Sequence, residues 1–439
     1  MTSRLTRREL VAWLAAGSGA IATGSLIAAG GDRSSTGSPR STAPPSEPAV
    51  PSDTSAPSLP TTAADGRIAE ASTESVPGDR LLVVVELPGG NDGLSTVVPY
   101  ASGRYHDVRE ATLIPEDEVL TLDDEIGLHP ELVGLHRDGV AVVEGVGSTR
   151  PDGSHFEMQQ RWWAGSSVAT DGATGWIGRL GDALATPDAP TTVLSVGSGA
   201  HPIIRSRTNS GLSMPDADAV WAVAGAEPDD ELRAAYQRAL RSFTDLESPL
   251  RTAMTDGFSF ADQLVDLSLD EDDADGLGYE GWGLGRSLQF AASVFTADVG
   301  IRVVHARTEG DYDTHDGHAW KHPGLMRELD ANLAAFRQDI ARRGLADRVV
   351  IMTTSEFGRT FRENGSGGLD HGTSSTMLIT GPGMAGRHGE APSYTDLDDN
   401  DDLRATVPVE SYLGGVVQGW LGVPADEVVG SDHEPLDLV

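Results

Sequence analysis

The stretch Leu81-Leu82-Val83-Val84-Val85-Glu86-Leu87 is the first strong strand signal in the chain. Continuous apolar runs that are rich in valine are typical of strands buried on both faces, as in parallel sheets. Similar runs recur at residues 140–143, 192–196, 301–304, 349–352 and 377–379. The sequence therefore predicts a sheet that is built largely from buried parallel strands.

Helical patterns lie between these runs. The clearest is an apolar face that repeats every three or four residues, at Leu325, Leu329, Leu333, Phe336 and Ile340. Strands that alternate with helices predict an α/β fold with a central, mostly parallel sheet. In such folds the chemistry lies beyond the carboxyl ends of the strands, so functional residues are expected in the loops that follow each run.

Residues 216–281 differ from the rest of the folded part. They carry two helix-like segments, at 230–242 and 258–269, and then an acidic turn. We interpret this region as a helical insertion that caps the sheet. The folded domain as a whole is expected to span residues 79–439.

The N-terminal region has the features of an export signal. Arg7 and Arg8 follow Thr6, and an apolar run rich in Ala and Gly comes next. Residues 1–31 are therefore predicted to be a twin-arginine signal, although the run is also long enough to act as an uncleaved membrane anchor. Residues 32–78 are rich in Ser, Thr and Pro and are predicted to form a disordered linker. We expect a periplasmic, extracellular or cell-surface protein with no membrane span in its mature domain.

Composition excludes several classes of function. The 439 residues include 32 Lys and Arg against 67 Asp and Glu, which gives a formal net charge of −35. Such acidity argues against binding of nucleic acid or anionic lipid, because both are bound by clustered positive charge. The chain has no cysteine, which excludes disulfides, thiolate metal sites and a cysteine nucleophile.

The loops after the predicted strands hold carboxylates and histidines. Asp and neutral His are preferred ligands of Zn²⁺ and similar divalent ions. Read singly, each loop has an ordinary explanation as a turn or as an acidic surface loop. At one edge of one sheet they predict a shared metal site, with ligand atoms roughly 3–5 Å apart. The side chains concerned are Asp92, Asp313, His315, Glu356, Asp370 and His371.

Ser154 follows the second predicted strand, at the expected start of a helix. Serine is a preferred helix N-cap, which is one explanation for it. The other is a nucleophile, because a hydroxyl at a helix N-terminus lies beside free N–H groups that can hold an oxyanion. His155 and Arg359 are candidates for stabilising the charge that develops on a substrate.

Seven motifs together resemble the exported "domain of unknown function 1501" family, in order and approximate spacing, from about residue 80 to Gly422. They are Leu87-Pro88-Gly89-Gly90-Asn91-Asp92-Gly93, Gly127-Leu128-His129-Pro130, Ser154-His155-Phe156, Gly175-Trp176-Ile177-Gly178-Arg179, Asp313-Thr314-His315, Ser355-Glu356-Phe357-Gly358-Arg359-Thr360 and Asp370-His371-Gly372. That family is grouped with the alkaline phosphatase and sulfatase superfamily of metal-dependent hydrolases. The resemblance implies a central sheet with helices on both faces and a metal centre at its carboxyl edge.

The resemblance also implies roles for individual residues. Ser154 stands where the superfamily keeps its nucleophile, and Asp92 resembles the metal carboxylate of the first strand. The other ligands implied are Asp313, His315, Glu356, Asp370 and His371. Phe357 stands where a histidine commonly follows the carboxylate, which removes a ligand from one metal. One or two divalent ions are therefore expected, Zn²⁺ first, with Mn²⁺, Mg²⁺ and Ca²⁺ as alternatives.

Two functions fit these observations. The first is an exported metal-dependent hydrolase of a phosphate or related ester, small or polymeric, with Ser154 or a metal-bound water as the nucleophile. The second is a non-catalytic exported binding protein on the same scaffold, which Phe357, the acidity and the linker favour. We expect the hydrolase. The formylglycine motif of sulfatases is not found in the sequence, which argues against that class of sulfatase.

Overall fold

A computed structural model describes residues 79–168, 174–197, 199–208, 211–214, 276–280 and 283–438. These residues belong to one compact unit of the chain. The predicted signal, the predicted linker and the helix-like segments at 230–242 and 258–269 lie outside the described residues, as does most of the predicted insertion. Among the residues that are described, no helix is long and apolar enough to cross a membrane.

The described residues form a large central sheet with the strand order β11-β5-β10-β9-β1-β8-β6-β7, and β12 pairs with β5. All of its pairings are parallel except those of β10, which is antiparallel to both β5 and β9. The predicted α/β fold with a mostly parallel sheet is confirmed. The strands are β1 (Leu81–Glu86), β5 (Ala141–Gly147), β6 (Val193–Val196), β7 (Gly211–Met214), β8 (Val303–Arg307), β9 (Val349–Thr354), β10 (Ser375–Thr380), β11 (Gly386–Gly389) and β12 (Val407–Pro408).

Strand β1 lies in the middle of the sheet and is buried along its whole length. Its side chains alternate between two hydrophobic clusters, as the pleat of a strand requires. Leu81, Val83 and Val85 belong to one cluster, whereas Leu82 and Val84 belong to the other. The valine-rich stretch is therefore apolar throughout because both of its faces are covered.

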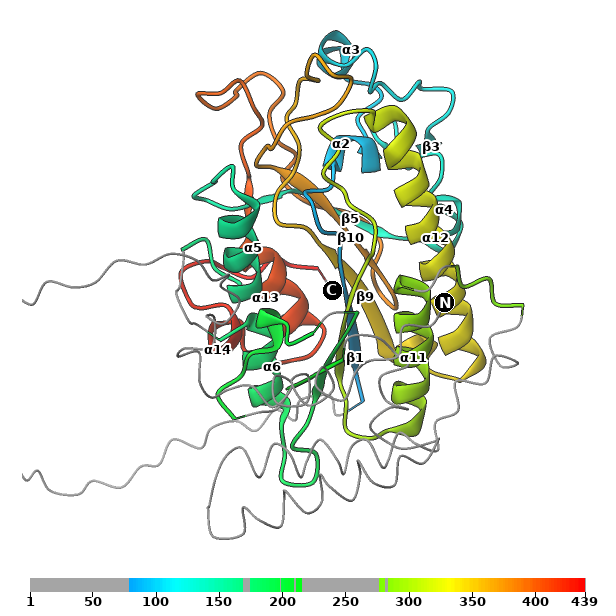
Figure 1. Cartoon of the computed structure of the whole chain (residues 1–439), viewed down its shortest axis with the longest axis vertical. Helices are drawn as coiled ribbons and strands as arrows, with labels where there is room; N and C mark the ends of the chain where they lie inside the picture. Colours follow the sequence, from blue (N-terminus) through cyan, green and yellow to red (C-terminus); the bar gives the residue numbers. More distant parts are fainter. Residues whose placement is uncertain are drawn as a thin grey trace, which may run out of the picture. The chain divides into compact units, whose positions relative to one another are not determined.

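Helices cover both faces of the sheet (Figure 1). One cluster joins the sheet to α4 (Val133–Asp138), α11 (Leu284–Ala297) and α12 (His318–Arg342). The other joins it to α5 (His155–Ala164), α6 (Trp176–Leu184), α13 (Val409–Gly419) and α14 (Ala425–Val428). The helix predicted from the leucine spacing is α12, and its predicted apolar face is buried from Leu329 to Ile340.

The remaining elements are short and lie mainly in the connections. A second sheet has the order β2-β4-β3, from strands at Val97–Val98, Gly127–Leu128 and Leu120–Thr121. Helices α2 (Gly93–Thr96) and α3 (Gly103–Val108) follow β1, and the 3-10 turns η1 (Pro202–Ile204) and η2 (Ala346–Arg348) follow β6 and α12. The carboxyl ends of β1, β8 and β9 lie side by side, so the loops that follow these strands meet at one edge of the sheet.

Candidate metal centre

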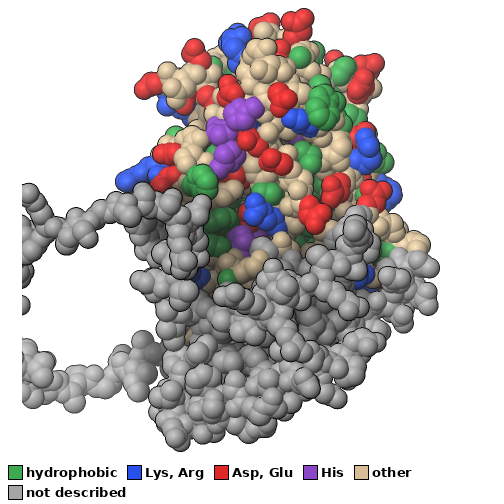
Figure 2. Space-filling model, viewed as in Figure 1, with side chains coloured by type: hydrophobic (Ala, Val, Ile, Leu, Met, Phe, Trp, Pro, Cys, Tyr) green, Lys and Arg blue, Asp and Glu red, His purple; other side chains and the backbone are tan. Residues whose placement is uncertain are grey.

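The loop between β8 and α12, the loop between β9 and β10 and the N-terminus of α5 meet at this edge. They bring Asp313, His315, His371 and His155 together. The four side chains are partly exposed, and Figure 2 shows histidines reaching the surface beside acidic side chains. The structure thus gathers side chains from loops that the sequence predicted to converge.

The tightest contacts join two histidines and one carboxylate. His315 Nε2 lies 2.8 Å from His371 Nε2, and both nitrogens approach Asp313 Oδ1, at 3.1 Å and 3.4 Å. Donor atoms bound at 2.0–2.2 Å to one tetrahedral ion lie roughly 3.3–3.6 Å apart. The triangle of atoms therefore has nearly the dimensions of one face of a zinc site.

The other ring nitrogen of each histidine is held by an acceptor. His371 Nδ1 lies 2.7 Å from the carbonyl oxygen of Gly153, and His315 Nδ1 lies 2.8 Å from Asp370 Oδ1. Hydrogen bonds from Asn364 and His315 lower the pKa of Asp370, so it accepts as a carboxylate. Burial lowers the pKa of His371, which keeps that ring neutral.

The tautomers of both rings follow from these partners. A carbonyl or carboxylate oxygen can only accept, so each Nδ1 carries the proton and each neutral Nε2 presents a lone pair. When both rings are neutral, two lone pairs and a carboxylate oxygen face one another. A cation in their midst resolves that repulsion, and Asp370 orients His315 as carboxylates commonly orient metal-bound histidines.

His155 adds a further donor atom. Its Nε2 is buried without a hydrogen-bond partner and lies 3.5 Å from Asp313 Oδ2. Its Nδ1 is 2.9 Å from Glu356 Oε1, and that hydrogen bond raises the pKa of His155. The same Glu356 oxygen accepts from the N–H of Gly89 and from Gln159. Glu356, which the sequence predicted as a metal ligand, therefore orients His155, and its Oε1 is occupied by His155, Gly89 and Gln159.

Asp92 is not placed with this group. Its two carboxylate oxygens form an ion pair with the buried Arg109, at 2.5 Å and 3.0 Å, and one of them lies 3.6 Å from His318 Nε2. Burial alone would raise the pKa of Asp92, but Arg109 outweighs it and holds that pKa well below the usual range. Arg109 binds both Asp92 oxygens, whereas Arg359 donates to one oxygen of Asp313, so the structure does not bring Asp92, predicted as a ligand, to the cluster.

Arg359 also has a different place from the one expected. Its side chain is fully buried, and its guanidinium donates to the carbonyls of Gly89, Gly90 and Leu369 and, at 2.5 Å, to Asp313 Oδ1. Burial acts to raise the pKa of Asp313, but the hydrogen bond from Arg359 outweighs it and lowers that pKa. Arg359 therefore orients Asp313 and is not free to contact a substrate.

Ser154 is the residue before α5, as predicted, but its hydroxyl makes no capping hydrogen bond. Its own N–H donates to Asp152 Oδ1 at 2.8 Å. The neighbours of Ser154 on both sides contact the cluster, since the Gly153 carbonyl binds His371 and His155 approaches Asp313. Ser154 therefore lies in sequence between two residues that contact the cluster, and no capping hydrogen bond engages its hydroxyl.

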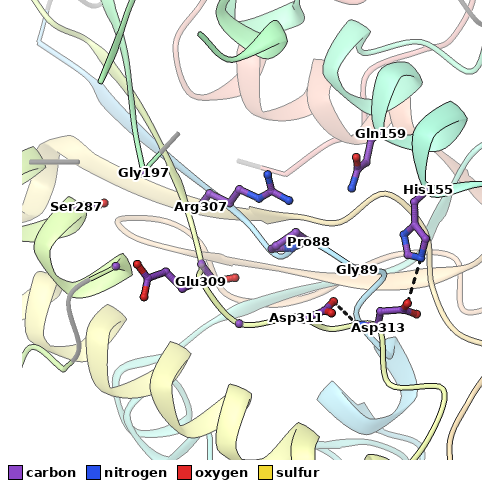
Figure 3. A pocket seen from close by; sticks show the side chains of 13 residues that line it. Pro88, Gly89, His155, Gln159, Gly197, Ser287, Arg307, Glu309, Asp311 and Asp313 are labelled. Atoms are coloured by element: carbon purple, nitrogen blue, oxygen red, sulfur yellow. Dashed lines mark hydrogen bonds and ion pairs between the residues drawn. The ribbon is translucent and has the colours of Figure 1, made fainter. Parts of the chain in front are cut away.

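A pocket of about 540 Å³ adjoins the cluster and is lined by His155 and Asp313. Figure 3 shows Arg307 and Gln159 directed into it, opposite the acidic Glu309 and Asp311. Our sequence reasoning missed Arg307, because the predicted strand stopped at residue 304 while β8 continues to Arg307. If the predicted strand had been extended from residue 304 to residue 307, Arg307 would have been placed at the carboxyl end of the strand.

Comparisons with known proteins agree with the motif pattern. A family model described as "Protein of unknown function (DUF1501)" matches residues 138–407. Among curated protein sequences, none matches this chain.

Solved structures with a similar chain path include the lipoteichoic acid synthase LtaP from Listeria monocytogenes, with a TM-score of 0.38, 11% identity and coverage of 81% of this chain and 76% of that one. Another is the phosphonate monoester hydrolase SpPMH from Silicibacter pomeroyi, with a TM-score of 0.37, 10% identity and coverage of 81% and 76%. Alkaline phosphatase from the Antarctic bacterium TAB5 has a TM-score of 0.29, 13% identity and coverage of 71% and 95%. Because these TM-scores and identities are low, the likeness to these structures carries no conclusion about the chemistry of this chain.

Proposed function

This chain belongs to the family described as protein of unknown function (DUF1501), and from that premise we propose that it is an exported, metal-dependent hydrolase of a phosphate or related ester. The observation that carries the proposal is the meeting of His315 Nε2, His371 Nε2 and Asp313 Oδ1 within 2.8–3.4 Å, with both Nδ1 atoms held by acceptors. The twin arginine at Arg7 and Arg8 supports the export part of the proposal.

The residues present fit a divalent ion. Asp313, His315 and His371 would hold it, and His155 Nε2 with Asp313 Oδ2 offers donors for a second ion. Nitrogen and oxygen donors of this kind suit Zn²⁺, and Mn²⁺, Mg²⁺ and Ca²⁺ remain alternatives. When bound, such an ion would supply positive charge that polarises the ester oxygen of a substrate.

The protein's own side chains have separate tasks in this proposal. Asp370 and Glu356 orient His315 and His155, and Arg359 orients Asp313. Ser154, at the N-terminus of α5, is the proposed nucleophile, and the free N–H groups of that helix end favour an oxyanion beside it.

Binding of an anionic ester needs local positive charge, because the chain carries a net charge of −35 and Glu309 and Asp311 line the pocket. Arg307 supplies one such charge within the pocket, and the ion would supply the rest. The substrate is therefore expected to place its anionic group between Arg307 and the Asp313 cluster.

A chelation experiment tests this function. Protein without residues 1–78 is treated with chelator and assayed on aryl phosphate, phosphonate and sulfate esters, with Zn²⁺, Mn²⁺, Mg²⁺ or Ca²⁺ returned singly. Turnover of at least one ester that is lost on chelation and restored by one ion supports the proposal. No turnover of any ester with any ion contradicts it.

One observation favours the second candidate, a non-catalytic binding protein. Phe357 is buried, and its ring lies 4.8 Å from the ring of His155 and 4.7 Å from that of His371. The aromatic ring of Phe357 therefore occupies the position at which the superfamily pattern has a further metal ligand. A protein that holds metal but hydrolyses none of the esters above fits this candidate.

A further inference from the structure

A second group of metal-ligating side chains lies in the interior, and none of its members was predicted as a ligand. Glu86 is the last residue of β1, His305 lies on the adjacent strand β8, and His201 precedes η1. The parallel register pairs Val84 with His305, so Glu86 and His305 project from the same face of the sheet. That face is the one covered by α5, α6 and α13.

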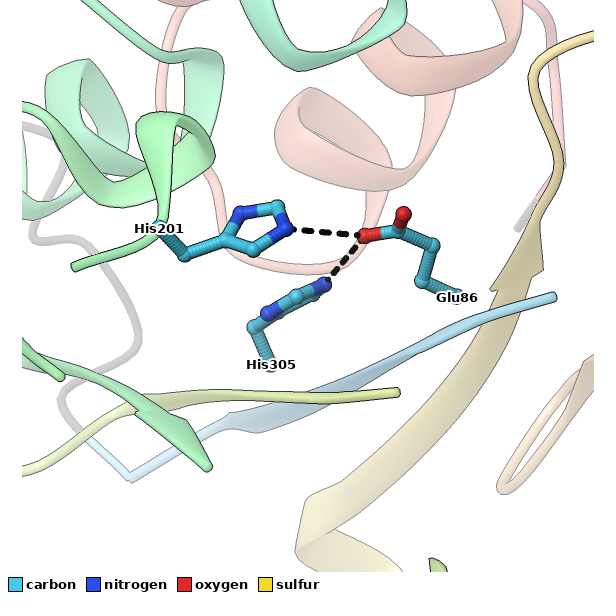
Figure 4. A group of neighbouring side chains, drawn as sticks. All are labelled: Glu86, His201 and His305. Atoms are coloured by element: carbon cyan, nitrogen blue, oxygen red, sulfur yellow. Dashed lines mark hydrogen bonds and ion pairs between the residues drawn. The ribbon is translucent and has the colours of Figure 1, made fainter. Parts of the chain in front are cut away.

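The donor atoms of the three side chains converge on one point (Figure 4). Glu86 Oε2 lies 2.9 Å from His305 Nε2 and 3.4 Å from His201 Nε2. The exposed fractions of Glu86, His201 and His305 are 4%, 7% and 0%. All three donor atoms lie within 4.8 Å of one another.

His201 gives the observation that ordinary packing does not explain. Its Nε2 is buried and has no hydrogen-bond partner, although it points at the Glu86 carboxylate. Buried polar atoms are nearly always satisfied, so an orphaned nitrogen aimed at a carboxylate and a second imidazole indicates a missing partner. Because His201 Nδ1 accepts from the N–H of Ile203, Nε2 carries the proton in this arrangement; in the other tautomer, Nε2 presents a lone pair that a cation between these atoms would satisfy.

The surroundings are compatible with the tautomers that a cation requires. Ser195 Oγ lies 2.9 Å from His305 Nδ1, and this hydroxyl can accept from Nδ1–H and so leave Nε2 as a ligand. Trp163 Nε1 lies 3.4 Å and Arg307 Nε 3.8 Å from the other Glu86 oxygen, Oε1, so Oε2 is the oxygen that faces the two histidines. Ligation through His201 Nε2 would break only the 3.3 Å hydrogen bond from the N–H of Ile203 to His201 Nδ1.

We propose that Glu86, His201 and His305 bind a divalent transition-metal ion, of which Zn²⁺ suits the donors best, as a site separate from the Asp313 cluster. Two imidazoles and one carboxylate are an established donor set for Zn²⁺. A cavity of about 10 Å³ adjoins Glu86, and it is the size that one water molecule occupies.

The role of this site is structural. It lies in the core, and its ligands come from β1, from β8 and from the segment before η1, so the ion ties that segment to the middle of the sheet. Metal bound only by the folded chain stabilises the folded state by mass action. Zinc is therefore expected to raise the melting temperature even when the Asp313 cluster is disabled.

Equilibrium zinc binding to chelator-treated protein tests the proposal in the Asp313→Asn background, where the first cluster has lost its shared carboxylate. We expect this variant to retain a zinc ion and to melt at a higher temperature with zinc than without it. Adding His201→Gln should remove both effects. Absence of bound zinc in Asp313→Asn, or undiminished affinity after His201→Gln, would overturn the proposal.

A milder variant covers the case in which His201→Gln does not fold. Ser195→Ala keeps all three ligands but removes the partner of His305, and such changes weaken metal affinity roughly 10–100-fold. Unchanged zinc affinity for Ser195→Ala in the same background contradicts the proposal. Because neither readout measures turnover, the result is independent of whether the Asp313 cluster is catalytic.

Discussion

His315 and His371 face each other through their Nε2 atoms at 2.8 Å, while their Nδ1 atoms are bound to Asp370 and to the carbonyl of Gly153. This relationship fixes where the protons are, and hence where the lone pairs point. Two neutral rings in that orientation cannot form a hydrogen bond with each other. A divalent cation between them would relieve the repulsion of the two lone pairs, and we propose this point as its site.

Asp313 is the residue whose loss should affect that cation most. Asp313→Asn removes a full negative charge from the cluster. Loss of a residue that only hydrogen-bonds to a metal ligand typically lowers metal affinity at least about tenfold, so we expect a loss of zinc affinity at least that large here. Asp316→Asn is the matched control, because Asp316 lies in the same loop but pairs with Lys321. Competition with a coloured zinc chelator measures both variants, and equal affinities would contradict the assignment.

Asp92 should behave as a structural residue. Arg109→Met leaves the Asp92 carboxylate buried without its partner, which is expected to cost about 3–5 kcal/mol of unfolding free energy. Asp92→Asn should likewise destabilise the fold. Neither change is expected to lower the zinc affinity of the Asp313 cluster. Urea unfolding and zinc titration of the two variants check this, and loss of zinc with unchanged stability would restore Asp92 as a ligand.

Ser154→Ala should affect rate and not stability. The Ser154 hydroxyl makes no capping hydrogen bond, so the free energy of unfolding should change by less than about 0.5 kcal/mol. Loss of a nucleophile should lower turnover of an aryl phosphate by at least about 10³-fold. Ser154→Thr should keep part of the activity. Ser148→Ala is the control in the same loop, and full activity in Ser154→Ala would move the attack to another group.

Arg307 should determine how tightly an anionic substrate binds. Arg307→Met removes the guanidinium that lines the pocket, and loss of one charge-assisted hydrogen bond is expected to raise KM roughly tenfold. Arg404→Met is the control, because Arg404 is on the surface and pairs with Asp396. Steady-state kinetics at constant ionic strength separate the two variants. A fall in kcat with unchanged KM would place Arg307 outside substrate binding.

The sequence predicts burial well and charge pairing poorly. The valine-rich β1 and the leucine face of α12 were predictable because their spacing follows from which face each residue buries. The partner of a buried charge has no such period. Asp92 and Arg359 both follow strands, yet one is bound by Arg109 and the other by backbone carbonyls and Asp313. Motif order alone could not distinguish these carboxylates and arginines from ones that face a ligand.

The buried group of Glu86, His201 and His305 was also not predicted from the sequence. Glu86 interrupts an apolar strand and His305 lies within another, which is an unusual place for charge in a doubly covered sheet. His201 lies far from both in sequence, so only the register of β1, β8 and β6 brings it to them. The signal available in the sequence was a carboxylate directly after the valine run, at the end of β1.

Diffraction at the zinc absorption edge, from crystals of the protein grown with Zn²⁺, shows whether a metal ion lies between Asp313, His315 and His371. We expect an anomalous peak roughly 2.0–2.2 Å from Asp313 Oδ1, His315 Nε2 and His371 Nε2. An anomalous map without a peak there, in crystals whose histidine rings keep the Nε2-to-Nε2 approach, would contradict it.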